Sequence, residues 1–137
     1  MKLKTIKTLF LTAALFNWAV GLALSLDAGL LFGLFGVNPV PSEPLFLQLF
    51  SWLVIVFGIG YFWASKDPAG NAAIIKLGIL GKLSVFAVGV ACVLSGSISW
   101  QMILLVSVDL LGLFFEAYVY SRLACHRPIV YVLHCES

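Results

Sequence analysis

The chain has 137 residues, of which 62% are hydrophobic and 10% are charged, and its net charge is +2. Soluble globular domains average roughly 45–50% apolar and about 25% charged residues. A chain this short has too little interior to hide so much apolar surface from water. The composition therefore excludes a soluble globular domain and predicts an integral protein of the lipid bilayer. No basic, aromatic-rich surface suggests nucleic acid as a partner.

Four apolar segments are each long enough to cross a hydrocarbon core of about 30 Å as a helix. They show no period-2 alternation, and a helix satisfies its own backbone hydrogen bonds in lipid, so a β-barrel is excluded. We predict an all-α fold, a polytopic membrane protein whose single domain is an antiparallel four-transmembrane-helix bundle with a short cytoplasmic tail at 121–137. The predicted spans cover about 9–26, 45–64, 72–95 and 98–120 of residues 1–137.

The first apolar segment is longer than one span. From Leu9 to Val37 only Asn17 and Asp27 interrupt the run, which is too long for an upright helix. We expect Asp27 at the outer interface, with residues 29–36 forming a re-entrant or interfacial piece; a long, tilted first helix is an equal alternative. The preceding lysines also resemble the start of a signal peptide, but the apolar run outlasts a signal core, so we expect the segment to be retained.

The links between the later spans carry helix-breaking and capping residues. Prolines in 38–44 prevent a continuous helix, and Ser42 or Glu43 is placed to cap the second helix with Pro44 in its first turn. The tight turn 67–71 ends in a residue suited to cap the third helix, and a link rich in Ser and Gly precedes the fourth. Links this short make sequential helices antiparallel neighbours.

The distribution of Lys and Arg predicts the orientation. The first and third links carry neither residue, and positive residues favour the cytoplasmic side of a membrane. We therefore predict a multi-pass protein of a bacterial inner (plasma) membrane, with both termini and the second link in the cytoplasm. The residues behind this prediction are Lys2, Lys4, Lys7, Lys66, Arg122 and Arg127.

Two charged residues lie deep inside predicted spans. Lys82 is near the middle of the third span and Asp109 near the middle of the fourth, so at about 1.5 Å per residue both come close to the midplane. A charge at this depth costs at least ~2.5–3.5 kcal/mol, so it is expected to be paired and indicates a functional site. Because the two spans are antiparallel neighbours, we predict a Lys82–Asp109 pair.

Further polar residues share the predicted interior. Glu116 lies on the same face of the fourth span as Asp109, with Gly112 between them, and roughly matches Lys76 in depth. Asn17 lies near the midplane on a seam that suits close helix packing and comprises Ala14, Asn17, Gly21, Ser25 and Ala28. The candidates for a ligand or proton site are Asn17, Lys82, Asp109 and Glu116, with Trp18, Lys76 and Tyr120 as secondary candidates.

Catalytic and metal-binding motifs are sparse. The sequence has no GxSxG, HExxH or Walker motif and no pair of histidines inside a span, so an enzyme is the less favoured interpretation. Zinc ligands gather only in the tail, where adjacent Cys and His rarely chelate one ion, so we predict no metal and no other cofactor. These tail residues are Cys125, His126, His134 and Cys135.

Short motifs resemble known groups of small bacterial inner-membrane proteins. The motifs are Phe16-Asn17-Trp18, Asp67-Pro68 and the Leu-Gly-Ile-Leu-Gly-Lys run at 77–82, set in a four-span layout. Over most of its length the chain resembles the BphX-like and DoxX-like four-helix proteins. Some DoxX-type proteins are associated with quinone-linked redox systems, so the resemblance implies a quinone or another lipophilic ligand and carries over no site residues.

Two functional hypotheses follow. In the first, a small integral membrane protein uses a buried polar site, Lys82 and Asp109, to bind a small or lipophilic ligand or to move a proton or solute. Trp18 then either lines a pocket for an apolar ligand or packs against lipid. In the alternative, the chain is a non-catalytic membrane subunit or scaffold, the ion pair is a structural lock, and the small-residue seams dock other helices. A membrane-protein partner or a homodimer is compatible with both.

Overall fold

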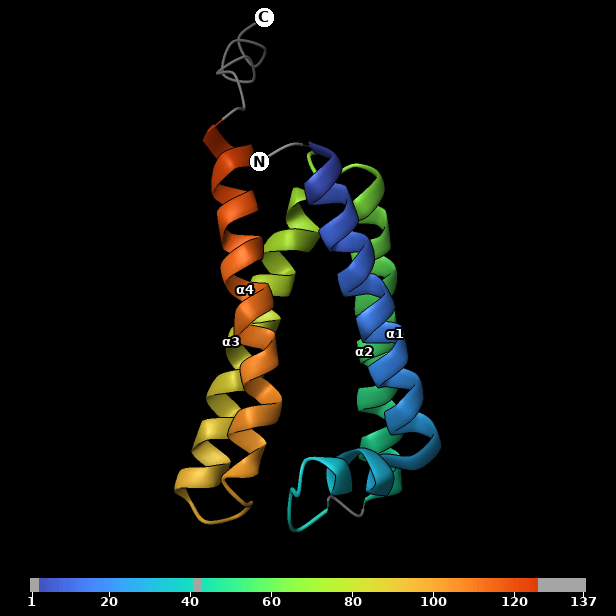
Figure 1. Ribbon diagram of the computed structural model, residues 1–137, viewed down its shortest axis with the longest axis vertical. Helices are drawn as coiled ribbons and strands as arrows, with labels where there is room; N and C mark the ends of the chain where they lie inside the picture. Colours follow the sequence, from blue (N-terminus) through green and yellow to red (C-terminus); the bar gives the residue numbers. More distant parts are fainter. Residues whose placement is uncertain (1–2, 41–42, 126–137) are drawn as a thin grey trace, which may run out of the picture.

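The computed structural model describes residues 3–40 and 43–125. In this part of the chain the regular structure is entirely helical, so the prediction of an all-α fold with four helices is confirmed (Figure 1). Each helix is long and apolar enough to cross a membrane. The helices are α1 (Leu3–Leu34), α2 (Pro44–Lys66), α3 (Ala72–Leu94) and α4 (Gln101–Cys125).

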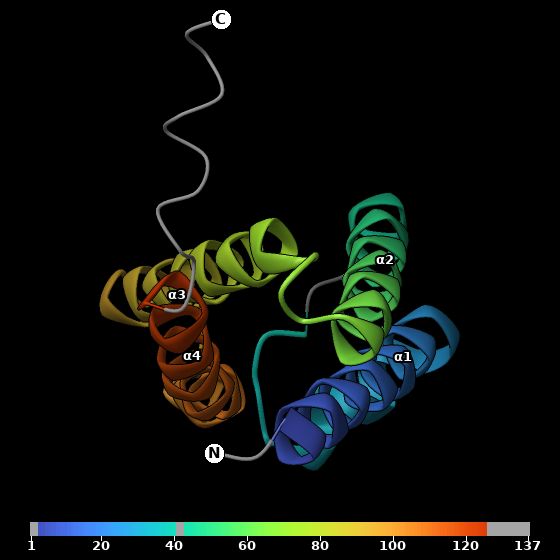
Figure 2. The same cartoon turned by 90° about the horizontal axis from the view of Figure 1, so that it is seen from above.

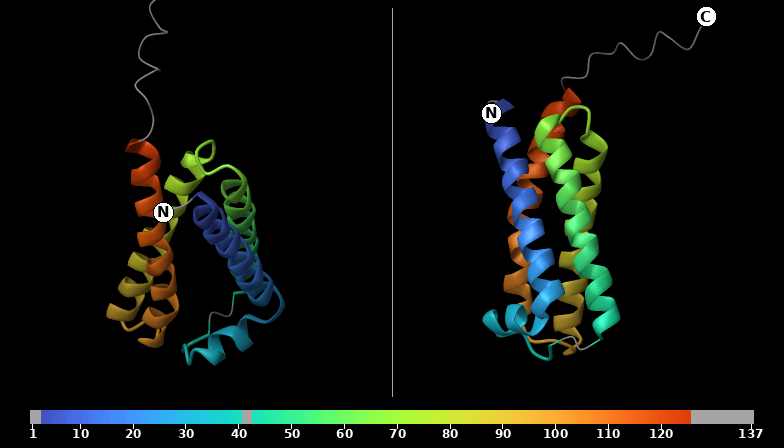
Figure 3. Two further views of the ribbon diagram at one scale, coloured as in Figure 1. Left: turned by 45° about the horizontal axis from the view of Figure 1, so that its top comes forward. Right: turned by 90° about the vertical axis from the view of Figure 1, so that its right-hand side faces the viewer.

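The helices are arranged as two antiparallel hairpins. Helix α1 packs along α2 and α3 packs along α4, whereas contact between the hairpins is limited (Figure 2). The hairpins meet at the end that holds the start of α1, the α2–α3 turn and the end of α4, which we call the converged end (Figure 1). They diverge toward the α1–α2 and α3–α4 links, which form the splayed end (Figure 3). The predicted bundle is therefore closed at one end and opened at the other.

The converged end holds the main hydrophobic core. All four helices contribute fully or almost fully buried side chains, so this cluster fixes how the two hairpins meet. Tyr61 is the largest of these side chains and is only 2% exposed. The members of the cluster are Ile6, Phe10, Ala14, Tyr61, Ala64, Ile75 and Val119.

Helix α1 is broken at Asp27. The backbone there leaves the helical region, with φ −154° and ψ 85°. The Asp27 side chain accepts a hydrogen bond from the Leu30 backbone N–H at 2.8 Å, so it caps a second short helical piece. That piece lies across the splayed end (Figure 1). Of the two interpretations of this segment, the structure supports a separate piece after Asp27 and not one long tilted helix.

The two hairpins are also tied together at the splayed end. The backbone N–H of Asn38 donates to the Ser99 hydroxyl at 2.8 Å, and the Ser99 N–H donates to the Asn38 carbonyl at 2.7 Å. These bonds hold Ser99 outside the helix, which explains why α4 begins at Gln101, after the predicted start at 98. A second apolar cluster packs beside them, built on Leu24, Phe32 and Val37 with Ile98, Met102 and Leu105 against it.

The predicted seam of small residues on α1 packs against α2. A Cβ atom on Gly21 would lie 2.6 Å from Ile55 Cγ1 and 3.0 Å from the Ser51 carbonyl oxygen, so only glycine permits this approach. Ser25 continues the contact by donating to the Gln48 side chain at 3.0 Å. The seam therefore lies in the contact between α1 and α2 of this chain, which counts against its use as a docking face for other proteins.

Candidate functional site

Lys82 forms a buried ion pair with Glu116. The Lys82 ammonium donates to Glu116 Oε1 and also to the Tyr61 hydroxyl at 2.8 Å. It lies over the Tyr61 ring as well, 4.5 Å from the ring centre, in a cation–π contact. Glu116 is 1% exposed. Helices α2, α3 and α4 thus supply the three side chains of one buried polar cluster.

The predicted Lys82–Asp109 pair is wrong, because the partner of Lys82 is Glu116. The number of residues from Lys82 to the end of α3 equals the number from the start of α4 to Leu113. Because the two helices are antiparallel, Lys82 and Leu113 lie at the same height along the hairpin. Glu116 and Asp109 therefore flank Lys82 by about one helical turn each. Side chains tilt toward the N-terminus of their own helix. In this antiparallel pair, Lys82 and Glu116 consequently tilt toward each other, whereas Asp109 tilts away.

Two glycines make room for the polar cluster. A Cβ atom on Gly78 would lie 2.5 Å from the Tyr61 hydroxyl oxygen and 2.9 Å from Glu116 Oε2. A Cβ atom on Gly112 would lie 3.1 Å from Lys82 Cε. Within the described residues, Glu116 Oε2 is buried without a hydrogen bond. The cluster therefore depends on the bare backbone of α3 at Gly78, whereas a side chain at Gly112 on α4 would require a small shift of Lys82.

A cavity of about 630 Å³ lies between the two hairpins. This volume is within the usual range for sites that hold small organic ligands. Most of its wall is apolar and comes from all four helices, with Phe57, Val85 and Leu105 as examples. The polar side chains in the wall are Asn17, Tyr61, Lys82, Ser84 and Asp109.

Asp109 lies on the cavity wall without a partner. In the part of the chain that the structure describes, no hydrogen bond or ion pair engages its carboxylate. Asn17 is also on the wall and donates to the Ala13 carbonyl at 2.9 Å. Glu116 is not part of the wall. The predicted polar set is therefore divided: Lys82 and Glu116 form an ion pair, whereas Asp109 and Asn17 face the cavity.

The secondary candidates lie outside this cavity. Trp18 fits over Gly58 between α1 and α2 and packs on Phe62 with ring centres 5.9 Å apart, so it neither lines the cavity nor lies wholly against lipid. Tyr120 packs against the core of the converged end. Lys76 is exposed and makes no ion pair with the described residues, so its match in depth to Glu116 produces no contact.

Sequence reasoning missed Tyr61. Tyr61 is not among the residues that the sequence indicated, yet its ring is buried and its hydroxyl meets Lys82. The positions of Tyr61 and Gly78 relative to the turn at 67–71 could have indicated this contact. Tyr61 and Gly78 lie at almost equal distances on either side of that turn, so a bulky ring faces a residue that has no side chain.

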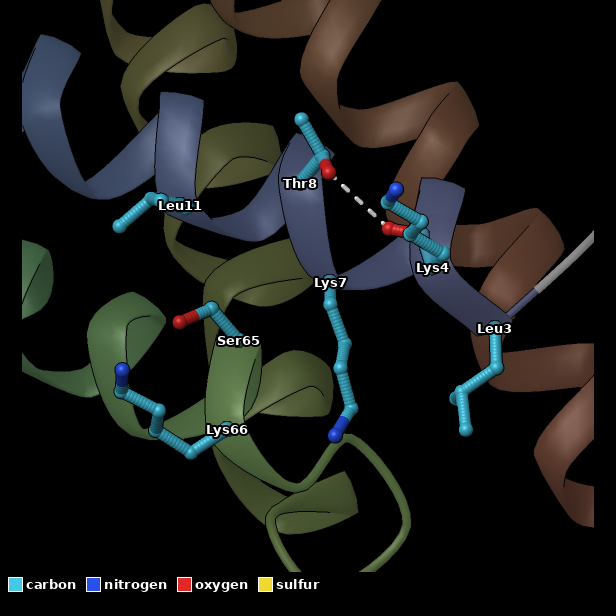
Figure 4. Close-up of a pocket in the computed structure, with 7 residues that line it drawn as sticks. All are labelled: Leu3, Lys4, Lys7, Thr8, Leu11, Ser65 and Lys66. Atoms are coloured by element: carbon cyan, nitrogen blue, oxygen red, sulfur yellow. Dashed lines mark hydrogen bonds between the residues drawn. The ribbon is translucent and has the colours of Figure 1, made fainter.

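A second hollow, of about 470 Å³, lies at the converged end between the start of α1 and the end of α2 (Figure 4). Lys4, Lys7 and Lys66 line it together with apolar and hydroxyl side chains. The three ammonium groups point in different directions and do not converge on one ligand position (Figure 4). Lys66 instead lies over the Phe62 ring, 4.8 Å from its centre. This hollow is a basic surface of the converged end.

Of the four tail residues considered as zinc ligands, Cys125 is the last residue of α4, and His126, His134 and Cys135 lie outside the described residues. Residues 3–40 and 43–125 contain no group of His, Cys, Asp and Glu side chains placed to hold a metal ion. No family model, no curated protein and no solved structure matches the chain. The resemblance to BphX-like and DoxX-like proteins stays a prediction.

Proposed function

We propose that the chain is an integral protein of a bacterial inner membrane with both termini in the cytoplasm. Apolar surface supports insertion, since Leu26, Leu94 and Leu111 are 84%, 82% and 75% exposed and such surface is not tolerated on a soluble monomer. The cations support the orientation. Lys4, Lys7, Lys66 and Arg122 belong to the helix ends and turn of the converged end, and positive residues favour the cytoplasmic side.

We propose further that the protein binds a small lipophilic ligand between its hairpins. The observation that carries this proposal is the cavity of about 630 Å³, whose wall is mostly apolar and includes a few polar groups. Ligand sites are usually built in this way, with apolar surface for affinity and few polar groups for orientation. A quinone or another lipophilic molecule fits this class. Movement of a proton or solute would depend on Asp109, the carboxylate on the wall.

Photolabelling tests the binding proposal. The purified protein in detergent is irradiated with a diazirine-bearing alkyl quinone, and labelled residues are mapped by tandem mass spectrometry. We expect label on wall residues such as Val54 and Leu105, and competition by excess unlabelled quinone. Label confined to outward-facing residues such as Val88 and Leu111, without competition, would contradict binding of this ligand in the cavity.

A pair of glycine variants provides the control. Gly81 is part of the wall and has room for a side chain, since the nearest atom to an added Cβ is Phe57 Cζ at 3.6 Å. Gly81→Leu should fill the cavity and abolish the competable label. Gly33 has nothing within 4 Å of an added Cβ and is not part of the wall. Gly33→Leu should leave the label unchanged.

The alternative hypothesis, a non-catalytic subunit or scaffold, keeps one supporting observation. The Lys82–Glu116 pair is buried and partnered, as a structural lock requires. Its first predicted docking seam, Ala14 to Ala28, is occupied by α2 of the same chain, as the close approach at Gly21 demonstrates. Its second, Gly29 and Gly33, stays open at Gly33, where an added Cβ atom meets nothing within 4 Å. The scaffold hypothesis gives the cavity between the hairpins no role. We therefore favour ligand binding over a scaffold role.

A further inference from the structure

The polar groups around the cavity leave one negative charge without a partner. Lys82 carries +1 and its ion-pair partner Glu116 carries −1, so these two cancel. Asp109 on the wall has no partner in the described residues and no second cation faces it. Tyr61 contributes a neutral hydroxyl from α2, and the α1 wall contributes no ionisable group. A ligand with a positive charge would supply the partner that Asp109 lacks.

The wall of the cavity opposite Asp109 is also suited to bind a positive charge. Helices α1 and α2 and the residue just after α1 contribute aromatic rings, whereas Asp109 comes from α4 in the other hairpin (Figure 2). Aromatic ring faces attract organic cations, above all when water is excluded. One ring of this wall, that of Tyr61, already attracts a cation, because the Lys82 ammonium lies over it. The aromatic residues are Phe16, Phe32, Phe35, Phe50, Phe57 and Tyr61.

We infer that the cavity binds a lipophilic organic cation, held between the Asp109 carboxylate and the aromatic side chains of α1 and α2. This inference rests on the proposed function and names the class of ligand. A quaternary ammonium or phosphonium group with apolar substituents has the required chemistry. It offers the charge that Asp109 needs, and its substituents cover the apolar wall without leaving polar atoms unpaired. An anionic ligand is disfavoured because Lys82, the one cation that the described residues place on the wall, already has Glu116 as its partner.

A pair of probes with opposite charge tests this inference. Tetraphenylphosphonium and tetraphenylborate have nearly the same shape and apolar surface, so they differ mainly in the sign of their charge. Binding of each radiolabelled ion to the purified full-length protein is measured by equilibrium dialysis against detergent alone. We expect saturable binding of the phosphonium and none of the borate. Asp109→Asn should weaken phosphonium binding by roughly 30-fold or more, because one member of a buried charge pair is lost. Asp109→Glu should retain phosphonium binding.

Wild-type protein alone provides a second measurement. A proton and the phosphonium compete for the Asp109 carboxylate, so the apparent Kd should rise as the pH falls. The other ionisable groups near the site are Lys82, Glu116 and Tyr61, and they are engaged with one another. The apparent Kd of Asp109→Asn should lack this dependence. Asp27→Asn, which changes a carboxylate outside the wall, should bind like the wild type.

The outcomes separate this inference from the proposed function. If phosphonium binds and Asp109→Asn weakens this binding by roughly 30-fold or more, the inference stands. If phosphonium binding is unchanged in Asp109→Asn, or if only the borate or a neutral quinone binds, the organic-cation inference is wrong but a lipophilic site remains. If none of the three probes binds and Gly81→Leu leaves the photolabelling pattern unchanged, both proposals are wrong.

Discussion

At the converged end all four helices supply buried side chains around Phe10, Ile75 and Val119. At the splayed end, the described residues join the hairpins through the Asn38–Ser99 bonds and the smaller apolar cluster that includes Phe32 and Val37. Between these two regions lies the cavity. The same helices are therefore packed against each other at one end and separated toward the other (Figure 1).

The two regions use their charged residues differently. Toward the converged end, Lys82 reaches from the cavity wall to the buried Glu116 and to Tyr61. Where the hairpins separate, Asp109 faces the cavity without a partner among the described residues. Residues that stabilise the helix arrangement can thus be distinguished from residues available to a ligand. The following predictions test this difference in order of expected effect.

The largest loss is expected for Lys82→Met. The substitution leaves the Glu116 carboxylate buried and uncompensated, which typically costs about 3–5 kcal/mol. Thermal unfolding in detergent, followed by circular dichroism, should give a much lower midpoint or little folded protein. A stability close to that of the wild type would contradict the assignment of Lys82–Glu116 as a stabilising pair.

A smaller loss is expected for Gly78→Ala. The added methyl group meets the Tyr61 hydroxyl oxygen at 2.5 Å and must displace it, and overpacking of this kind costs about 1–3 kcal/mol. The matched control is Gly33→Ala, which has nothing within 4 Å of the new methyl group and should be neutral or slightly stabilising. Equal effects of the two substitutions on the unfolding midpoint would argue against a crowded site at Gly78.

Ser99→Ala weakens the connection at the splayed end. It removes the hydroxyl that accepts the Asn38 N–H, a bond worth about 1 kcal/mol. Ser97→Ala is the control, because among the described residues its hydroxyl bonds to Ser95 alone, within the same link. Hydrogen exchange in detergent should show faster exchange at the Asn38 amide in Ser99→Ala and an unchanged rate in Ser97→Ala. No difference between the variants would contradict the connection.

Asp109→Asn should have the smallest effect on stability. Its carboxylate makes no hydrogen bond or ion pair with the described residues, so the free energy of unfolding should fall by no more than about 0.5 kcal/mol. Glu116→Gln, the same chemical change in the same helix, should cost far more. If both variants lose stability equally in denaturant titrations, the two carboxylates do not differ in role.

The number, type and approximate bounds of the helices could be predicted from the sequence because they depend on local features. Apolar runs identify the helices, and Pro44 and the turn at 67–71 interrupt them. The break at Asp27 was one of two open interpretations, because a short polar side chain can cap a new helix or lie at the end of an old one.

The arrangement of the site could be predicted only in part. Depth along the helices matched Lys82 with Asp109 and Glu116 with Lys76. Which carboxylate Lys82 meets depends on the direction in which each side chain tilts, and this direction reverses between antiparallel helices. The role of Tyr61 and the cavity depend on how the hairpins diverge. How far the hairpins separate is set by contacts between residues distant in the sequence, such as the Asn38–Ser99 bonds that limit the separation, and such contacts leave no local pattern.

The most direct test compares two double variants for their ability to rescue Lys82→Met. Folded yield and unfolding midpoint are measured in the same detergent for Lys82→Met with Glu116→Gln and for Lys82→Met with Asp109→Asn. Removing both members of a buried pair leaves no uncompensated charge, so we predict that the Glu116→Gln double variant regains most of the lost stability. The Asp109→Asn double variant should remain as unstable as Lys82→Met alone. Rescue by Asp109→Asn and not by Glu116→Gln would show that Asp109 is the partner of Lys82 and would contradict the separation of structural pair and ligand site.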